Sequence, residues 1–475
     1  MVDVNTIGTI VTGNETSLVN LTQRFSRHSG FHELRADLLT ERENSLWEFI
    51  AAHGDSLLFT LRSADEGGGF DGSSLEKMAL LVRALRAGAA MVDVELSFLQ
   101  VLPHDEKDAF LAQYGHRVMV SRHLMEWDLP ALEATVQGLA AVKCQGAKLA
   151  LFIADAAELV HLSAISLPHP LKIVVGMGFA GLITRLRPSL FGSDVTFAPL
   201  DEKGATLAFQ PTLSQLAAYG RYQENPWLLA LAGGAQIRHS PGLCVYNALY
   251  ESRKMPWQYG LLPTARASQL PVLLRSLGIK GISVTMPLKA AVAEIVEAAD
   301  EWVEKTGVCN TVLVKGDSLM GYNTDARAFS QLAAPGQGET ALILGSGSTA
   351  GSAFYALGAL GYRCRVAGRT PPLHGAMKEA YIPWNQRTEV THQVLVNTTP
   401  FSLDGPESVW PWPVSAHTIF DLALVGGDPF PAENRPGQRR IGGFEFWCHQ
   451  GALQMTLLTG AAVTPAELLA LGKHP

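Results

Sequence analysis

The sequence predicts an α/β protein of several domains, with a (β/α)8 barrel in its N-terminal half and further α/β domains after it. The chain has 475 residues, whereas a single domain commonly has about 150. Eight short β-rich runs recur through the first 220 residues, as the strands of a barrel do. A glycine-rich turn joins a buried strand to a helix near residue 345, which is typical of an α/β sheet.

The composition is that of a folded, acidic protein. Hydrophobic residues make up 47% and charged residues 17% of the chain, and 37 Lys and Arg against 44 Asp and Glu give a net charge of −7. Binding to nucleic acid needs a basic face, so we expect no such partner. No apolar run approaches the roughly 18 residues of a membrane helix. The segment Met1–Asn5 has neither the basic nor the apolar region of a secretory leader.

The cysteines argue for a reducing compartment. They are odd in number and widely spaced, which fits neither a disulfide framework nor a zinc cluster. We expect a cytoplasmic protein with reduced thiols and no bound metal. The five are Cys144, Cys244, Cys309, Cys364 and Cys448.

The eight β-rich runs set a strand–helix rhythm. Their starts are roughly 20–35 residues apart, the length of a βα unit. Ser73 and Ser74 precede apolar residues at helical spacing, which predicts a capped helix between two runs. Periodicity alone leaves an open α/β sheet as an alternative to the barrel. The runs are Ile7–Val11, Phe31–Leu34, Leu57–Leu61, Met91–Leu96, Val118–Val120, Lys148–Ile153, Lys172–Val175 and Val195–Ala198.

Polar residues gather at these runs, mostly at their ends, where a barrel carries its chemistry. Each alone has an ordinary explanation, such as a surface ion pair, a loop histidine or a lysine at a strand edge. Their combination points to a site. They are Glu33, Arg35 and Asp37 on one face of a run, Arg62, His123 and Lys148.

The order of these motifs resembles the type I 3-dehydroquinate dehydratase family over roughly residues 5–220. The motifs are Glu-Leu-Arg-Ala-Asp at 33–37, Phe-Thr-Leu-Arg at 59–62 with Glu-Gly-Gly at 66–68, Val-Asp-Val-Glu-Leu at 92–96, Ser-Arg-His at 121–123, and Phe-Gly-Ser at 191–193 with Thr-Phe at 196–197.

The resemblance implies that Lys148 forms a Schiff base with 3-dehydroquinate, that His123 is the general acid and base, and that Glu66 orients His123. An imine withdraws electrons from the neighbouring carbon, and a histidine near pH 7 can then remove its proton. Lys143 remains an alternative to Lys148, because Gln145–Lys148 departs from the family pattern. The implied substrate-binding residues are Glu33, Arg35, Arg62, Arg185, and, in a lid over the site, Thr206 and Gln210.

A second set of motifs follows the polar stretch Gly220–Pro226, where we place a domain boundary. A helical run is expected at Ala290–Lys305. Further on, a buried strand at Ala341–Leu344 runs into the glycine-rich turn Gly345–Gly351, and a helix and a strand are expected at Ser352–Leu360 and Arg363–Ala367. Backbone N–H groups at such a helix start can hold a pyrophosphate, although an ordinary tight turn is the alternative.

The end of the second strand favours NADP over NAD. An NAD site usually places a carboxylate there for the ribose 2′-hydroxyl. This chain instead has Gly368, Arg369 and Thr370, and an arginine suits a 2′-phosphate.

These motifs resemble shikimate dehydrogenases over roughly residues 230–475. They are Val-Thr-Met-Pro-Leu-Lys at 284–289, Asn-Thr at 310–311, Asn-Thr-Asp-Ala at 323–326, the glycine turn with Gly-Arg-Thr at 368–370, Val-Asn-Thr-Thr-Pro at 396–400, and Gly443 with Gln-Gly-Ala at 450–452 and Thr-Gly at 459–460.

The second resemblance implies that Lys289 and Asp325 form the catalytic pair, with the lysine as proton donor to the oxygen being reduced. The implied substrate-binding residues are Ser240, Thr285, Asn310, Asn323 and Gln450. The implied NADP-binding residues are Gly345, Gly347, Ser348, Thr349, Ala350, Arg369, Thr370, Asn397 and Gly443. In the segment that binds the substrate carboxylate in the family, Gly242 replaces a serine and Tyr246 replaces a histidine.

The two resemblances fit one protein, because the product of the first reaction, 3-dehydroshikimate, is the substrate of the second. We expect a bifunctional enzyme for two consecutive steps of the shikimate pathway, which leads through chorismate to the aromatic amino acids. The alternatives are a quinate/shikimate dehydrogenase with an impaired barrel and a non-catalytic metabolite-sensing regulator. The expected domains are a barrel at 1–220, a substrate-binding domain at 226–335 completed by 446–475, and a Rossmann domain at 336–445.

Overall fold

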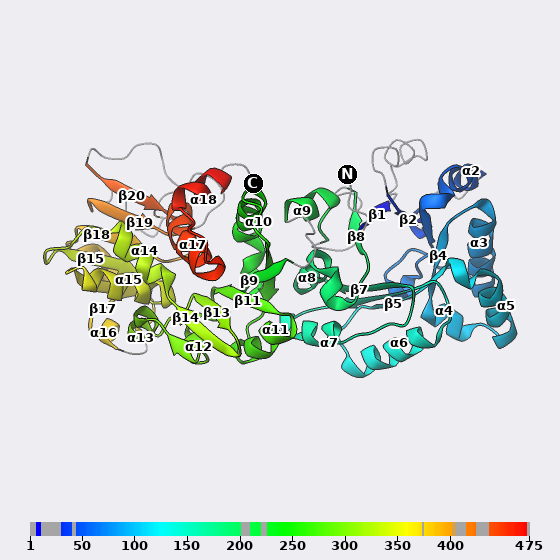
Figure 1. The fold of residues 1–475 in the computed structure, drawn as a ribbon. Coiled ribbons are helices and arrows are strands. Elements are labelled where there is room, and N and C mark those ends of the chain that lie inside the picture. The colour runs from blue at the N-terminus through cyan, green and yellow to red at the C-terminus, as the bar shows by residue number, and fades with distance from the viewer. Residues whose placement is uncertain are drawn as a thin grey trace. The chain divides into compact units, whose positions relative to one another are not determined.

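The computed structural model of the chain describes residues 6–10, 30–39, 44–200, 210–219, 226–372, 375–401, 403, 415–423 and 437–472. The described residues form three sheets with helices packed beside them (Figure 1). The chain divides into two compact units, Met1–Pro226 with Tyr259–Thr264, and Trp227–Gln258 with Ala265–Pro475. No helix in these ranges is long and apolar enough to cross a bilayer.

The first sheet is the predicted barrel. Its strand order is β7-β6-β5-β4-β3-β2-β1-β8, and each paired neighbour is parallel. The end strands β7 and β8 approach each other where the backbone N–H of Asp194 donates to the carbonyl of Lys172 (2.8 Å). All eight expected runs are confirmed as strands, and the open sheet is the wrong alternative. The strands are β1 (Thr6–Ile10), β2 (His32–Arg35), β3 (Leu57–Thr60), β4 (Met91–Glu95), β5 (Val118–Leu124), β6 (Gly146–Phe152), β7 (Leu171–Met177) and β8 (Thr196–Pro199).

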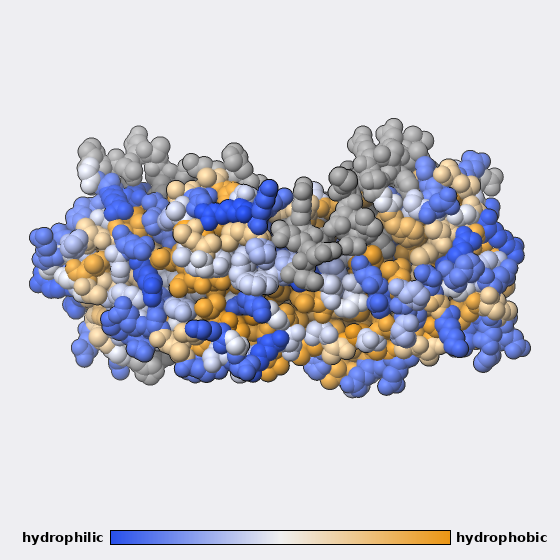
Figure 2. Space-filling model, in the orientation of Figure 1, coloured by the Kyte–Doolittle hydropathy of each residue, from blue (hydrophilic) through white to orange (hydrophobic). Residues whose placement is uncertain are grey.

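Helices alternate with the barrel strands. The expected cap is confirmed, since the side chain of Ser73 accepts a hydrogen bond from the backbone N–H of Glu76 (3.2 Å) at the start of α3. On the face drawn in Figure 2, hydrophilic side chains cover the region of α3 and α5, and Phe110 is the buried residue of α5. The helices are α2 (Asn44–His53), α3 (Ser74–Ala87), α4 (Leu96–Val101), α5 (His104–Tyr114), α6 (Leu129–Ala141), α7 (Leu159–Ser163), α8 (Leu182–Leu186) and α9 (Leu213–Ala218).

The second sheet mixes parallel and antiparallel strands. Its order is β10-β9-β11-β13-β14-β12, with β11 parallel to β9 and antiparallel to β13. The strands are β9 (Trp227–Gly233), β10 (Trp257–Pro263), β11 (Ile279–Val284), β12 (Ala298–Ala299), β13 (Thr311–Lys315) and β14 (Ser318–Tyr322). The helices that accompany it are α10 (Gly242–Ser252), α11 (Leu270–Ser276), α12 (Lys289–Ala293), α13 (Glu301–Thr306), α14 (Thr324–Leu332), α17 (Gly443–Thr459) and α18 (Pro465–Gly472).

The expected helical run at Ala290–Lys305 is wrong. The structure divides it into α12, the short strand β12 and α13. β12 pairs with β14, and the Asp300 side chain starts a new helix by accepting a hydrogen bond from the backbone N–H of Val303 (2.9 Å). A sheet contact distant in sequence therefore outweighs the local helical pattern.

The third sheet is fully parallel, with the order β17-β16-β15-β18-β19-β20. This is the strand order of a Rossmann fold, whose cofactor site lies where the order reverses, next to β15. The strands are β15 (Thr340–Leu344), β16 (Arg363–Gly368), β17 (Tyr381–Pro383), β18 (Val394–Asn397), β19 (Thr418–Asp421) and β20 (Arg439–Gly442). The helices are α15 (Ser348–Ala359) and α16 (Ala376–Glu379).

Candidate active sites

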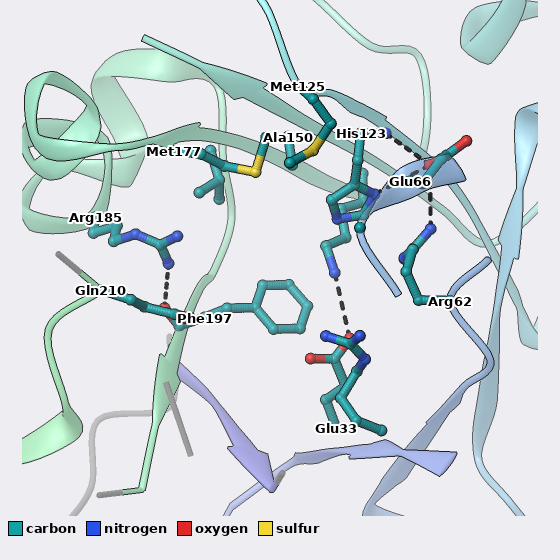
Figure 3. Close-up of a pocket in the computed structure, with 14 residues that line it drawn as sticks. Glu33, Arg62, Glu66, His123, Met125, Ala150, Met177, Arg185, Phe197 and Gln210 are labelled. Carbon is teal, nitrogen blue, oxygen red and sulfur yellow. Dashed lines mark hydrogen bonds and ion pairs between the residues drawn. The ribbon is translucent and has the colours of Figure 1, made fainter. Parts of the chain in front are cut away.

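A pocket of about 650 Å³, its mouth included, opens at the C-terminal ends of the barrel strands. Figure 3 shows His123, Glu66 and Arg62 on one side of it, Arg185 and Gln210 on the opposite side, and the ring of Phe197 between them. Its lining residues are Glu33, Arg35, Arg62, Glu66, Gly67, His123, Met125, Lys148, Ala150, Val175, Met177, Arg185, Phe197 and Gln210.

Lys148 reaches this pocket from β6. Its amine lies 3.4 Å from Glu33 Oε1 and 3.6 Å from Asp93 Oδ2, and it stands 4.0 Å from the centre of the Phe197 ring. The side chain of Lys148 is 8% exposed. Lys143, the alternative, is exposed and lies before β6, in the loop that follows α6. Of the two lysines, the structure brings Lys148 into the pocket.

His123 and Glu66 form a contact pair beside Lys148. Glu66 Oε2 accepts a hydrogen bond from the backbone N–H of His123 (2.8 Å) and lies 3.3 Å from His123 Nδ1. Burial, followed by the positive charges of Arg62 and Lys148, holds the pKa of His123 well below its usual value of 6.5. The imidazole is therefore neutral at neutral pH and able to accept a proton.

Arg62 is the centre of a buried charge network that the sequence analysis did not identify. Its guanidinium contacts Asp93 (2.8 Å), Glu95 (3.3 Å) and Glu66 (3.4 Å). Burial opposes ionisation of Asp93, but the charges of Arg62 and Lys148 outweigh it and lower the pKa of Asp93. One signal was available in the sequence, since Asp93 and Glu95 alternate with valines in a strand where burial is expected.

A buried lysine extends this network. The Lys77 amine from α3 contacts Glu95 and donates to Ser63 Oγ (2.6 Å), and the side chains of Lys77 and Glu95 are 3% and 2% exposed. It also stands 5.5 Å from the ring centres of Phe70 and Phe98. Glu95 is therefore shared between two cations, Lys77 and Arg62.

The remaining expected barrel residues lie around the rim. Arg35 ends β2 and makes a two-pronged contact with Asp37 (2.9 and 2.7 Å), although the strand stops at Arg35 and Asp37 lies in a following turn. Arg185 lines the pocket from α8 and donates to the carbonyl of Phe197 (2.6 Å). Gln210 also lines the pocket, and Thr206 lies outside the described residues.

A second cluster joins the second and third sheets around Lys289. The Lys289 amine donates to Asp325 Oδ2 (2.6 Å) and lies 3.5 Å from Thr349 Oγ1 at the start of α15. Asn310 donates to Asp325 Oδ1 (2.9 Å) and Thr324 Oγ1 (2.9 Å), so both oxygens of the aspartate are held. A lysine beside an oriented carboxylate can donate a proton to a carbonyl oxygen.

Of the other expected substrate-binding residues, one contacts the Lys289 cluster and another makes its contacts elsewhere. Gln450 from α17 joins it, since Thr324 Oγ1 lies 3.4 Å from Gln450 Oε1. Thr285 follows β11 and is half-buried. The side chain of Asn323 is turned elsewhere, because it caps α14 and bonds Thr306 and Ser352.

The altered carboxylate segment forms the start of α10. The Ser240 hydroxyl accepts from the backbone N–H of Gly242 (3.2 Å), and Gly242 is the first residue of the helix. Tyr246 is buried and stacks on Trp447 (ring centres 5.1 Å apart). The tyrosine thus fills the space beside α17, against Trp447 and Gly451.

The glycine turn after β15 suits a dinucleotide. Gly345 has a φ of +105°, which favours glycine, and the space around the α-carbon of Gly347 is open to 4 Å. Ser348, Thr349 and Ala350 form the first turn of α15, which begins here rather than at Ser352 as expected.

The remaining expected cofactor residues are of two kinds. Arg369 and Thr370 are exposed just after β16. Asn397 is fully buried and donates to Asp421 (2.7 Å), which ties β18 to β19. Gly443 starts α17, where a side chain would meet the carbonyl of Ala423 at 2.8 Å.

Within the described ranges, no group of three His, Cys, Asp or Glu residues is arranged to hold a metal.

Comparisons with known proteins match each half of the chain. The family described as type I 3-dehydroquinase matches residues 9–223, and the shikimate dehydrogenase substrate binding domain matches residues 233–312.

The chain is also similar to individual proteins and solved structures. The bifunctional 3-dehydroquinate dehydratase/shikimate dehydrogenase, chloroplastic, of Arabidopsis thaliana is 26% identical over 497 aligned positions, which cover 92% of this chain and 80% of that protein. The shikimate dehydrogenase (NADP(+)) of a Synechococcus species is 31% identical over 276 positions, 52% of this chain and 94% of that protein. The solved structure of dehydroquinate dehydratase and shikimate dehydrogenase from S. pombe AroM is 20% identical, covers 99% of both chains and has a TM-score of 0.40.

Proposed function

Because the chain belongs to the shikimate dehydrogenase family and matches the type I 3-dehydroquinase family ahead of that region, we propose that it catalyses two consecutive reactions. The barrel dehydrates 3-dehydroquinate to 3-dehydroshikimate, and the C-terminal half reduces 3-dehydroshikimate to shikimate with NADPH. The observation that carries this proposal is the presence of two acid–base sets on one chain, Lys148 with His123 and Lys289 with Asp325.

In the barrel, Lys148 acts as the nucleophile. Its amine adds to the ketone carbon of the substrate, and water leaves to form an imine. Electron withdrawal by the imine acidifies the adjacent carbon, and the neutral imidazole of His123 removes a proton there. The same imidazole returns that proton to the departing hydroxyl, which leaves as water. Hydrolysis of the imine then releases the product and restores the Lys148 amine.

The charged rim binds the rest of the substrate. Arg185 and Gln210 lie across the pocket from His123 (Figure 3), where they can hold the carboxylate. Glu33, Arg35 and Arg62 also line the pocket and can bond the hydroxyls. We assign Thr206 to the lid over this site, on the resemblance alone.

In the C-terminal half, Lys289 protonates the carbonyl oxygen as it is reduced. Asp325 fixes the amine (2.6 Å) and is itself held by Asn310 (2.9 Å). Gln450, with Ser240 and Thr285, completes the substrate site, and Asn323 supports it by capping α14. The substrate is therefore held between the second sheet and the start of α15.

NADP is the cofactor that the third sheet suits best. When bound in its reduced form, NADPH, it would supply the hydride for the reduction. The open space at Gly347 and the first turn of α15 would hold the pyrophosphate, and Gly345 provides the positive φ of the turn that leads there. Arg369 and Thr370 would hold the 2′-phosphate, since both are exposed at the end of β16 and no carboxylate lies there. Asn397 and Gly443 shape the walls of the site.

We propose three domains with the boundaries 1–220, 226–335 with 446–475, and 336–445. One sheet lies in each.

We place the protein in the cytoplasm, because all five cysteines are free thiols, which suits a reducing compartment. Recovery of the protein in an organelle or outside the cell on fractionation would contradict this placement.

A direct assay tests the proposed function. Purified protein given 3-dehydroquinate alone should produce 3-dehydroshikimate, seen as the ultraviolet absorbance of its conjugated carbonyl. With NADPH added, shikimate should form in its place. Oxidation of quinate or shikimate without any dehydratase activity would favour a dehydrogenase with an impaired barrel, and no turnover at all would favour a regulator.

A further inference from the structure

We propose that Arg122 is a positioning residue of the barrel site, which together with Ser97 holds one oxygen of Glu66 so that the other oxygen stays against His123. This inference rests on the proposed dehydratase function. It assigns a role to a side chain that does not line the pocket and that neither the chemistry of Lys148 nor substrate binding requires.

The five contacts of Glu66 divide between its two oxygens, and one of them is the 3.4 Å contact of Arg62 with Oε2. Oε1 accepts from Arg122 Nη1 (2.8 Å) and from Ser97 Oγ (2.8 Å). Oε2 accepts from the backbone N–H of His123 (2.8 Å), and it lies 3.3 Å from His123 Nδ1. The terminal torsion of a glutamate is broad and weakly restrained by itself. Contacts on both oxygens therefore fix the direction in which Oε2 points.

Strand β5 provides a contact to each oxygen of Glu66. Arg122 and His123 are neighbours near the end of β5, and each contacts a different oxygen of Glu66. Ser97 approaches from α4. The Glu66 side chain is 2% exposed whereas that of Arg122 is 32% exposed. Loss of the arginine therefore disturbs the carboxylate without removing a side chain from the core.

The charge of Arg122 also affects the protonation of His123. The charged groups around His123 come from five other positions of the barrel, namely Arg35, Arg62, Glu66, Asp93 and Lys148. Arg122 pairs with Glu66 and so limits how far that carboxylate can stabilise an imidazolium. Without Arg122 the pKa of His123 should rise. As the pH is lowered, the imidazole would then become protonated, and stop acting as a base, at a higher pH than in the parent protein.

The test compares Arg122→Met with Arg122→Lys in the full-length protein. In Arg122→Met, kcat for dehydration should fall about tenfold with little change in KM, since general-base catalysis is worth roughly 10²–10⁴-fold and is here impaired rather than removed. The acid limb of the kcat/KM profile should move to higher pH by about half a unit to one unit. Arg122→Lys should restore most of kcat, and Ser97→Ala should lower kcat by a smaller factor.

Two controls separate the outcomes. Shikimate oxidation should be unchanged in every variant, because that site is formed by residues after 226. Lys172→Met is the matched control, since it removes a cation of similar exposure (34%) near the N-terminal end of β7, away from the site. It should leave dehydration unchanged.

The inference is overturned if Arg122→Met keeps the parental kcat and pH profile. It is also overturned if both Arg122 variants lose activity equally with no shift of the acid limb, which would mean a packing role. If the parent itself has no dehydratase activity, the proposed function fails, and this inference fails with it.

Discussion

The surroundings of Lys148 distinguish it from Lys143. The Phe197 ring and the mostly buried position limit its hydration, while Glu33 and Asp93 lie within 4 Å. Lys143 has none of these contacts among those described and is exposed outside β6. The geometry therefore favours Lys148 where the sequence left two candidates.

Borohydride reduction in the presence of 3-dehydroquinate should attach the substrate covalently to Lys148, because it reduces the imine to a stable amine. Peptide mapping by mass spectrometry locates the label. Lys148→Ala should lose both label and dehydration, whereas Lys143→Ala should keep both. A label on Lys143, or none on the active parent, contradicts the assignment.

The exposed guanidinium of Arg369 should select NADP. Arg369→Ala should raise KM for NADP about ten- to a hundredfold, since a hydrogen bond to a charged group is worth roughly 1.5–3 kcal/mol. KM for NAD should change little. Arg365→Ala is the matched control, because Arg365 is an exposed arginine on the same strand. Equal effects on both cofactors would refute this role for Arg369.

Sequence reasoning identified the residues that carry recognisable chemistry but not those that position them. His123 and Glu66 stand in motifs, and Lys148 was one of two candidate lysines; the structure places all three in one pocket. The contacts of Arg62 with Asp93, and of Lys77 with Glu95, join residues that local patterns do not link. Such contacts depend on strand register and helix placement, which follow only from the folded barrel.

At the level of elements, the barrel strands were predictable because buried parallel strands form short apolar runs. The broken run at Ala290–Lys305 was not, since its sheet contact with β14 comes from another part of the chain. The Rossmann turn was found from its glycines, but the start of α15 at Ser348 was placed four residues late. Ends of elements depend on capping by neighbours and are less visible in sequence than their cores.

The ion pair of Lys77 and Glu95, which joins α3 to β4, should contribute to the stability of the barrel. Lys77→Met leaves Glu95 buried with one cation fewer, which costs about 3–5 kcal/mol. The temperature at which dehydratase activity is lost should fall by roughly 6–20 °C. Lys77→Met with Glu95→Gln should recover much of that loss, because the buried carboxylate that Lys77 balances is then also removed. Unchanged thermal inactivation of Lys77→Met would contradict a stabilising role.

The start of α10 is where we expect the C-terminal half to bind the carboxylate of shikimate. Gly242 is in helical backbone, which serine also adopts, so Gly242→Ser should fold normally. It should tighten shikimate binding up to roughly tenfold, the value of one neutral hydrogen bond. Titration calorimetry measures the change, and dehydroquinate turnover is the control. A stable variant with unchanged affinity would mean that another group, beside Ser240, already holds the carboxylate.

At the scale of the whole molecule, one chain carries two chemistries that use separate sets of residues. The barrel residues all precede 226, and the residues around Lys289 all follow it. A change in one set should therefore leave the other reaction intact. The product of the barrel is the substrate of the C-terminal half. Conversion of 3-dehydroquinate to shikimate therefore needs both sets of residues, but the two sets can be on different protein molecules.

The most direct test follows NADPH consumption when 3-dehydroquinate is the only substrate supplied. The parent protein should consume NADPH, whereas neither Lys148→Ala nor Lys289→Ala should do so. Lys148→Ala lacks the dehydration step and Lys289→Ala lacks the reduction step. Lys148→Ala should recover when 3-dehydroshikimate is supplied, and Lys289→Ala should accumulate that compound. Mixing the two variants should restore NADPH consumption. Consumption by Lys148→Ala on 3-dehydroquinate, or none by the parent, would contradict the account.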